Sequence, residues 1–165
     1  MAENTDSRTE EGREKVASII KKTRVAMLTH ADGRGRLVSH PMATQDVEFD
    51  GTVLFITERD TDKVAAITAN PQVNVAYSGS AEWVSLSGTA RVVNDVEKMR
   101  ELWGTFTEAE MEGGPEDGNN VLIVVDADTA EYWESRGGRI GQLFNLARSV
   151  TTKEPVKGEN EVVDL

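Results

Sequence analysis

The chain of 165 residues contains no cysteine, and this absence removes three kinds of chemistry. Disulfide bonds, thiolate metal sites and cysteine nucleophiles are all excluded. Histidine is nearly as scarce, because His30 and His40 are the only two and cannot build a typical zinc site by themselves, although carboxylates are plentiful. The Gly-x-Ser-x-Gly elbow of hydrolases and the glycine-rich phosphate loops of Walker or Rossmann type are also missing. The sequence therefore shows neither a familiar nucleophile nor a familiar metal centre.

Long apolar runs and an excess of basic residues are lacking as well. No apolar run approaches the roughly 20 residues that span a bilayer. The first residues, Met1 to Asp6, are polar and acidic, so we expect no secretory signal. The net charge is −11, with 29 acidic against 18 basic residues, which disfavours nucleic acid and anionic lipid as partners. These features predict a cytoplasmic protein that binds neither nucleic acid nor membrane.

The chain does contain many short apolar segments that are separated by turn residues. Asp32-Gly33 and Asp50-Gly51 are typical hairpin turns, and Gly88 suggests a bulge within a strand. The expected strands cover residues 25–29, 36–39, 47–49, 52–57, 73–77, 82–88, 89–93, 121–125 and 130–133. They show no alternation of strand and helix, so the pattern favours an antiparallel barrel or sandwich with added helices.

Four helices are expected beside these strands, at residues 9–22, 60–69, 96–106 and 139–150. Residues 1–8 have no periodicity and are expected to be disordered. The length favours one domain. We therefore expect a disordered N-terminus at 1–8, a barrel domain at 9–135, and a C-terminal helix and tail at 136–165.

The segment from Leu54 to Lys63 predicts an apolar strand that runs into the start of a helix. Thr61 is a good N-cap, and Lys63 falls in the first turn. A lysine there interacts unfavourably with the helix dipole, which costs roughly a few tenths of a kcal/mol of stability. A bound phosphate would make the lysine charge favourable instead. In the alternative interpretation the helix is capped and Lys63 is solvated, its charge balanced by Asp60 and Asp62.

Several segments, in their order and spacing, resemble the FMN-binding split-barrel family. They are Leu37–Ala43, Leu54–Lys63, Asn70–Tyr77 and Trp83–Ala90. This is the pyridoxamine 5'-phosphate oxidase-like group, and within it the branch called general stress protein 26. The resemblance runs from Val25 to Trp133 and extends more weakly into the tail at Gly158–Leu165. It implies a mainly β fold with added helices, an antiparallel split β-barrel, that binds FMN at the interface of a homodimer.

The resemblance also implies which residues lie near the cofactor phosphate. Thr57, Thr61 and Lys63 match the phosphate-side positions of the family. His40 takes a position where most members have arginine, and histidine is only partly cationic at neutral pH. If His40 faces the phosphate, affinity should be lower than with arginine and should depend on pH. In the alternative, His40 is a strand residue whose ring is satisfied within the protein. We expect His30, which precedes a turn, on the surface.

Other positions match the ring side of the cofactor. Pro41 follows His40 in the family's Arg-Pro-Met type of motif, and Met42 and Ala43 match positions where backbone groups meet the isoalloxazine edge. Trp83 matches a position that in relatives reaches the cofactor of the other subunit. Trp103 matches a tryptophan common in this branch.

The function implied by the resemblance is flavin chemistry, in which the protein supplies position and electrostatics. True pyridoxamine phosphate oxidases end with an arginine/histidine cluster that holds the substrate phosphate. Here the matching region, Tyr132 to Arg136, lacks that cluster, so we do not expect a pyridoxal phosphate synthase. The leading hypothesis is an FMN-dependent oxidoreductase acting on a small molecule, or a holder of flavin in a stress role. The alternatives are a deazaflavin-dependent reductase and a non-catalytic dimer whose site is weakened by His40.

Overall fold

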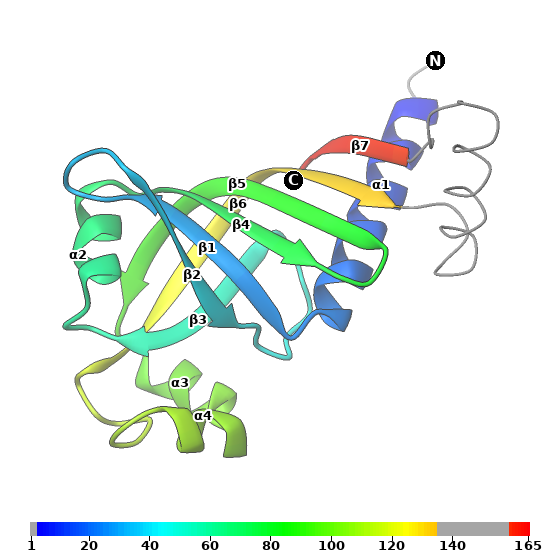
Figure 1. The fold of residues 1–165 in the computed structure, drawn as a ribbon. Coiled ribbons are helices and arrows are strands. Elements are labelled where there is room, and N and C mark those ends of the chain that lie inside the picture. The colour runs from blue at the N-terminus through cyan, green and yellow to red at the C-terminus, as the bar shows by residue number, and fades with distance from the viewer. Residues whose placement is uncertain (1–2, 135–158) are drawn as a thin grey trace, which may run out of the picture.

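The computed structural model describes residues 3–134 and 159–165 (Figure 1). Its elements, in chain order, are α1 (Glu3–Lys22), β1 (Val25–Ala31), β2 (Leu37–Ala43), β3 (Thr52–Glu58), α2 (Asp62–Ala69), β4 (Gln72–Ser78), β5 (Glu82–Val93), α3 (Val96–Leu102), α4 (Thr105–Glu110), β6 (Asn120–Glu134) and β7 (Glu159–Asp164). The expected C-terminal helix at 139–150 lies outside the described residues.

All the strands belong to one antiparallel sheet of seven strands in the order β2-β1-β4-β5-β6-β3, with β7 also paired to β6. The sheet curls, and β2 comes into contact with β3 (Figure 1). Among the described residues no hydrogen-bonded ladder joins those two strands, so the barrel is split there. The predicted fold class, a mainly β antiparallel split barrel with added helices, is confirmed.

The core forms because alternate strand residues point into the barrel. The inward side chains at its centre are Leu28, Phe55, Val75, Leu86 and Ile123, and all are fully buried. Helix α1 closes one end of the barrel with Val16, Ile19 and Ile20. Burial of each such side chain contributes about 1.5–3 kcal/mol, so this cluster supplies much of the stability of the fold.

The bulge expected at Gly88 is confirmed. The register between β5 and β6 shifts between Ser87 and Gly88. A Cβ atom at Gly88 would lie 2.1 Å from the backbone oxygen of Asp126, closer than any side chain tolerates. Glycine is needed here because the partner backbone occupies the space of a side chain.

Three strand expectations are corrected by the structure. Residues 47–49 are not a strand, and the Asp50-Gly51 turn leads instead into β3, which pairs with β6. The strands expected at 121–125 and 130–133 are one long strand, β6, because β5 pairs with it along nearly its whole length. A further strand in the tail, β7, has no counterpart in the expectations.

The helices also differ from expectation at their ends. Helix α1 begins at Glu3, six residues before the expected start at residue 9. The helix expected at 96–106 is two helices, α3 and α4, separated at Trp103 and Gly104. Glycine within a helix costs about 1 kcal/mol relative to alanine, which makes Gly104 a natural place for this break. The chain changes direction at this break, so that α4 lies next to the ends of β2 and β3.

Candidate functional site

A cavity of about 350 Å³ lies between the ends of β2 and β3, the start of α2, and α4. Six of the residues predicted to bind a cofactor line it: Pro41, Met42, Ala43, Thr57, Thr61 and Lys63. They come from three consecutive elements, β2, β3 and the start of α2. The fold therefore joins the predicted phosphate-side positions and ring-side positions in one pocket.

The remaining wall of the cavity comes from α4, which the sequence reasoning did not include. Phe106, Thr107, Glu110 and Met111 line this side, and Phe106 is 64% exposed. Phe106 continues the apolar spacing of α3, so the sequence predicts one helix that contains both. Gly104 is the sequence signal for the break that places Phe106 in a separate helix, α4.

The start of α2 faces this cavity with an open helix end. Thr61 occupies the N-cap position, as predicted, with extended backbone angles of φ −111° and ψ 150°. Its side chain makes no capping bond, because the hydroxyl donates to the backbone oxygen of Glu58 at 2.9 Å. The first amides of α2 therefore lack the cap that threonine usually provides, and they carry the positive end of the helix dipole.

Lys63 is the cation at this helix start. Its side chain is half-buried, and burial lowers the pKa of Lys63, while the charge of Glu58 works in the opposite direction. Thr57 is buried beside it in the cavity wall. An anion placed here would meet an ammonium, an uncapped helix end and a buried hydroxyl.

His40 directly precedes Pro41 of the cavity lining but is not itself part of that lining. Its ring lies parallel to that of His30, with centroids 5.1 Å apart and planes 5° from parallel, and the two Nε2 atoms are 3.0 Å apart. Burial, followed by the neighbouring His30 and the charge of Lys63, lowers the pKa of His40. His30 is only 3% exposed, so the expectation that it lies on the surface is wrong: on β1 it shares the inward face with Leu28.

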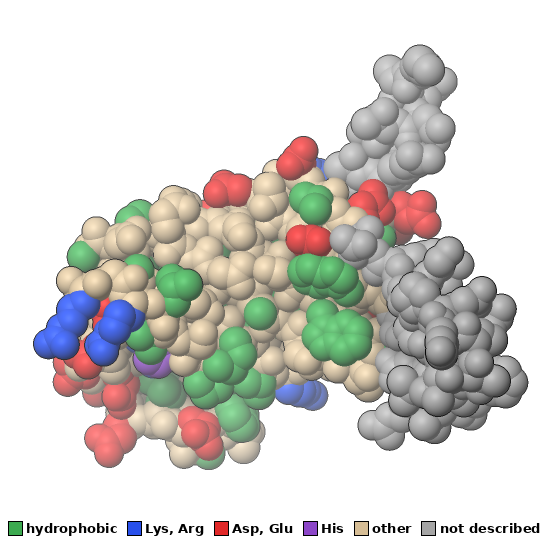
Figure 2. Space-filling model, turned by 45° about the horizontal axis from the view of Figure 1, so that its top comes forward, with side chains coloured by type: hydrophobic (Ala, Val, Ile, Leu, Met, Phe, Trp, Pro, Cys, Tyr) green, Lys and Arg blue, Asp and Glu red, His purple; other side chains and the backbone are tan. Residues whose placement is uncertain are grey.

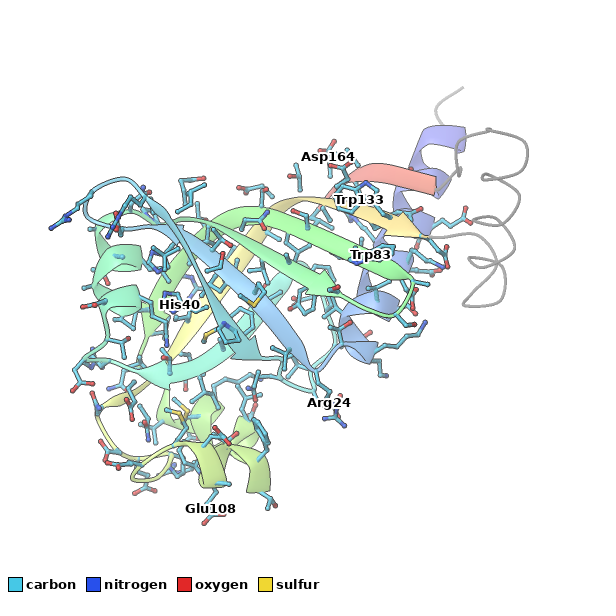
Figure 3. The ribbon with its side chains drawn as sticks, viewed as in Figure 1. Arg24, His40, Trp83, Glu108, Trp133 and Asp164 are labelled. Atoms are coloured by element: carbon cyan, nitrogen blue, oxygen red, sulfur yellow. The ribbon has the colours of Figure 1, made fainter. Side chains whose placement is uncertain are left out.

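The two predicted tryptophans lie outside the cavity. Trp83 is 38% exposed and stands opposite Trp133 in the register of β5 and β6. Both are at the other end of the sheet from His40 (Figure 3). Trp103 packs against a small cluster of Met99, Leu122 and Val124 under α3. Neither Trp83 nor Trp103 reaches the cavity within one copy of the chain.

The sequence matches the family model for proteins described as pyridoxamine 5'-phosphate oxidase like, over residues 11–157. The chain belongs to this family. The family predicted from the sequence is thus confirmed, and the pocket described above is that of a pyridoxamine 5'-phosphate oxidase-like protein.

Several solved structures resemble this family member. The general stress FMN/FAD binding protein of Xanthomonas citri is 31% identical, with a TM-score of 0.68, over 78% of this chain and 92% of that one. The general stress protein 26 of Bacillus anthracis is 25% identical, with a TM-score of 0.66, over 73% of this chain and 92% of that one. By sequence, the chain is also similar to protein bli-3 of Neurospora crassa, which is 29% identical over 85% of this chain and 73% of its own length.

In this family member the outer face of β2, β1, β4 and the first half of β5 is poor in charge. Val25 and Met27 of β1 are exposed there. Polar residues on this face bond to each other: Thr29 to Ser39 at 2.7 Å, and the Asn74 amide to the Ser85 hydroxyl at 2.7 Å. Figure 2 shows a view in which hydrophobic and uncharged side chains fill the middle and charged ones lie toward the margins. This composition is typical of a surface that can be covered by another protein.

Two features are absent from the described residues. No helix in the described ranges is long and apolar enough to cross a membrane. No group of three or more histidine, cysteine, aspartate or glutamate side chains in the same ranges is arranged to hold a metal ion.

Proposed function

We propose that this chain is an FMN-binding protein of the general stress type that acts as a flavin-dependent oxidoreductase on a small molecule. The observation that carries the proposal is that one cavity brings Lys63 and the start of α2 together with Met42 and Ala43. The volume of about 350 Å³ falls within the range of small-molecule sites. A relative is described as binding FMN/FAD, which supports flavin as the ligand.

The residues present fit the phosphate of a flavin nucleotide. Lys63 supplies a charge-assisted donor, and the uncapped amides of α2 supply backbone donors, the usual combination for a phosphate. Thr57 offers a hydroxyl in the same wall. Thr57, Thr61 and Lys63 all line the same cavity.

The remaining walls suit the ring system. Met42 and Ala43 line the side of β2, while Phe106 and Met111 lie on the side of α4. The apolar side chains on these two sides suit a planar ring placed between them. When bound, a flavin supplies hydride or electron transfer, and the protein contributes position and electrostatics. Tyr132 and Trp133 replace the phosphate-binding cluster of true pyridoxamine phosphate oxidases, so the proposal excludes pyridoxal phosphate synthesis.

We further propose that the protein is a homodimer with the cofactor at the interface. The uncharged outer face supports this arrangement, as do the exposed Val25, Met27 and Trp83. Trp83 lies at the other end of the sheet from His40 (Figure 3) and does not line the pocket of its own copy, so we propose that it reaches the pocket of a partner. The cytoplasmic location predicted from the composition belongs to the same proposal.

The visible absorption spectrum of the purified full-length protein, followed by titration with FMN, tests the cofactor. We expect two flavin bands and saturable FMN binding. A single near-ultraviolet band would overturn the proposal in favour of a deazaflavin. Absence of any band together with absence of FMN binding would support the non-catalytic alternative.

Sedimentation velocity at micromolar concentration with FMN present tests the dimer. We expect a dimer for the wild type and a shift toward monomer for Trp83→Glu. Lys21→Glu is the matched control, because it adds a carboxylate at an exposed position of α1 and should leave the dimer intact. A wild-type monomer would contradict the proposal.

A further inference from the structure

The buried ring of His30 has no part in the function proposed above, yet it is the direct partner of His40. The two Nε2 atoms are 3.0 Å apart, which is a hydrogen-bond distance and requires one nitrogen to donate and the other to accept. The second ring nitrogen of His30, Nδ1, is 3.2 Å from the backbone oxygen of Ala31. The two contacts together define the proton positions.

A carbonyl oxygen can only accept a hydrogen bond, so Nδ1 of His30 carries a hydrogen. In a neutral imidazole the other nitrogen then has the lone pair. Nε2 of His30 is therefore the acceptor, and Nε2–H of His40 is the donor. The neutral pair thus leaves the lone pair of His40 on its Nδ1 atom.

An added proton has two destinations with different consequences. On Nδ1 of His40 it leaves the bond between the rings intact and makes it charge-assisted, which strengthens it. On Nε2 of His30 it would either place two N–H groups against each other at 3.0 Å or, if His40 became the Nδ1–H tautomer, leave the charge on a ring that is only 3% exposed. The pair therefore accepts one proton, and the deeper burial of His30 places the charge on His40.

The charged groups around the pair come from several elements. Lys63 on α2 acts on His40 directly, and Glu58 on β3 acts on Lys63. Asp32, which follows His30, is engaged by Arg36 and by the backbone of Arg34. Burial, followed by the neighbouring His30 and the charge of Lys63, lowers the pKa of His40, which favours the neutral ring when no anion is present. A phosphate beside Lys63 would favour the charged form.

We propose that His30 is a positioning residue that holds the Nε2–H of His40, so that His40 takes up one proton on Nδ1 when a phosphate-bearing ligand binds beside Lys63. The inference rests on the proposed function for the identity of the ligand. It does not rest on it for the proton positions within the pair, which exist in the ligand-free protein.

Nitrogen-15 NMR of the histidine rings in the ligand-free protein tests the positioning role. We expect His30 as the Nδ1–H tautomer and His40 as the Nε2–H tautomer above neutral pH. His30→Gln keeps an acceptor oxygen and should preserve the His40 tautomer, whereas His30→Phe removes the acceptor and should produce a mixture. A wild-type His40 in the Nδ1–H form, or a tautomer that is the same in His30→Phe, would overturn the role.

Calorimetry of FMN binding in buffers with different ionisation heats tests the proton uptake. The phosphate itself titrates near pH 6, so wild type and His40→Gln must be compared under identical conditions. We expect wild type to take up more protons than His40→Gln, by at most about one. His30→Gln should resemble wild type, and riboflavin, which lacks the phosphate, should show no difference between wild type and His40→Gln.

The outcomes separate the two proposals. Equal proton counts for wild type and His40→Gln with FMN would overturn the uptake while leaving flavin binding intact. A difference seen with inorganic phosphate but not with FMN would assign the site to free phosphate and not to the cofactor. If FMN does not bind to wild type at all, the proposed function fails, and the NMR comparison alone then decides the role of His30.

Discussion

Two helices of this protein begin in opposite ways. At the start of α3 the carboxylate of Asp95 accepts a hydrogen bond from the backbone of Lys98 at 2.9 Å, which caps the helix. At the start of α2 the corresponding side chain, that of Thr61, turns away and donates to Glu58. Both helices carry a lysine in the first turn, Lys98 in α3 and Lys63 in α2.

The surroundings of the two lysines differ in the same way as the two helix starts: one is satisfied within the protein and the other is not. Lys98 is paired with Glu101 at 2.8 Å, an exposed pair that raises the pKa of Lys98. Lys63 is half-buried in a cavity wall, and burial lowers its pKa. The start of α3 is therefore capped by a side chain of the protein itself. The first amides of α2 have no such cap, and they and Lys63 are available to a ligand. The first arrangement stabilises the fold, and we propose that the second serves binding.

The largest expected effect is that of Lys63→Ala on FMN affinity. Loss of a charge-assisted hydrogen bond of about 1.5–3 kcal/mol should raise the dissociation constant roughly tenfold or more. The fold should remain intact. Fluorescence titration with FMN measures the change, with Lys98→Ala as the matched control that should bind normally. Identical titrations for wild type and Lys63→Ala would place the phosphate elsewhere.

The second prediction compares the two caps. Asp95→Ala should lower the free energy of unfolding by about 1 kcal/mol, because it removes a real capping bond. Thr61→Ala should cost less, because the Thr61 hydroxyl does not cap α2. Urea unfolding of the ligand-free variants measures both losses. An equal or greater loss for Thr61→Ala would break the contrast between the two helix starts.

The smallest effect is a pH dependence of stability from His40. Its pKa is lowered in the folded protein, so the unfolded chain binds the proton first as pH falls. The stability of the ligand-free protein should therefore decline below about pH 6.5, the ordinary histidine value. His40→Gln should flatten this decline when both proteins are followed by thermal unfolding. A steeper decline in His40→Gln than in wild type would mean that protonation of His40 stabilises the folded protein, which contradicts the prediction.

Much of the fold could be predicted because its signals are local. The turn after Ala31, the bulge at Gly88 and the helix ended by Asn70-Pro71 each depend on a few adjacent residues. The strand expected at 47–49 failed for the opposite reason. Alternation of side chains shows that a segment can be a strand, but a strand also needs a partner, and β6 pairs with β3 beginning at Thr52.

The candidate site shows the same division. Thr61 and Lys63 could be predicted because a helix start has a local pattern. The burial of His30 could not be predicted, because it depends on the pairing of β1 with both β2 and β4. The contribution of Phe106 also escaped prediction, since its place depends on the direction that α4 takes after Gly104.

One edge of β6 is shared by two strands, with β3 on Asn120–Asp126 and β7 on Thr129–Glu134. Val163 of β7 packs on Gly12 of α1, where a Cβ atom would lie 2.6 Å from a Val163 methyl group, and Arg13 donates to the backbone oxygen of Asp164.

An exposed strand edge is a template for pairing with other chains. The tail strand β7 therefore protects β6 from pairing with other chains, because among the described residues it covers the part of the β6 edge that β3 leaves open. Substitution of Gly12 by a larger residue would push β7 off this edge, and the damage would appear first as self-association through β6, before any loss of the barrel.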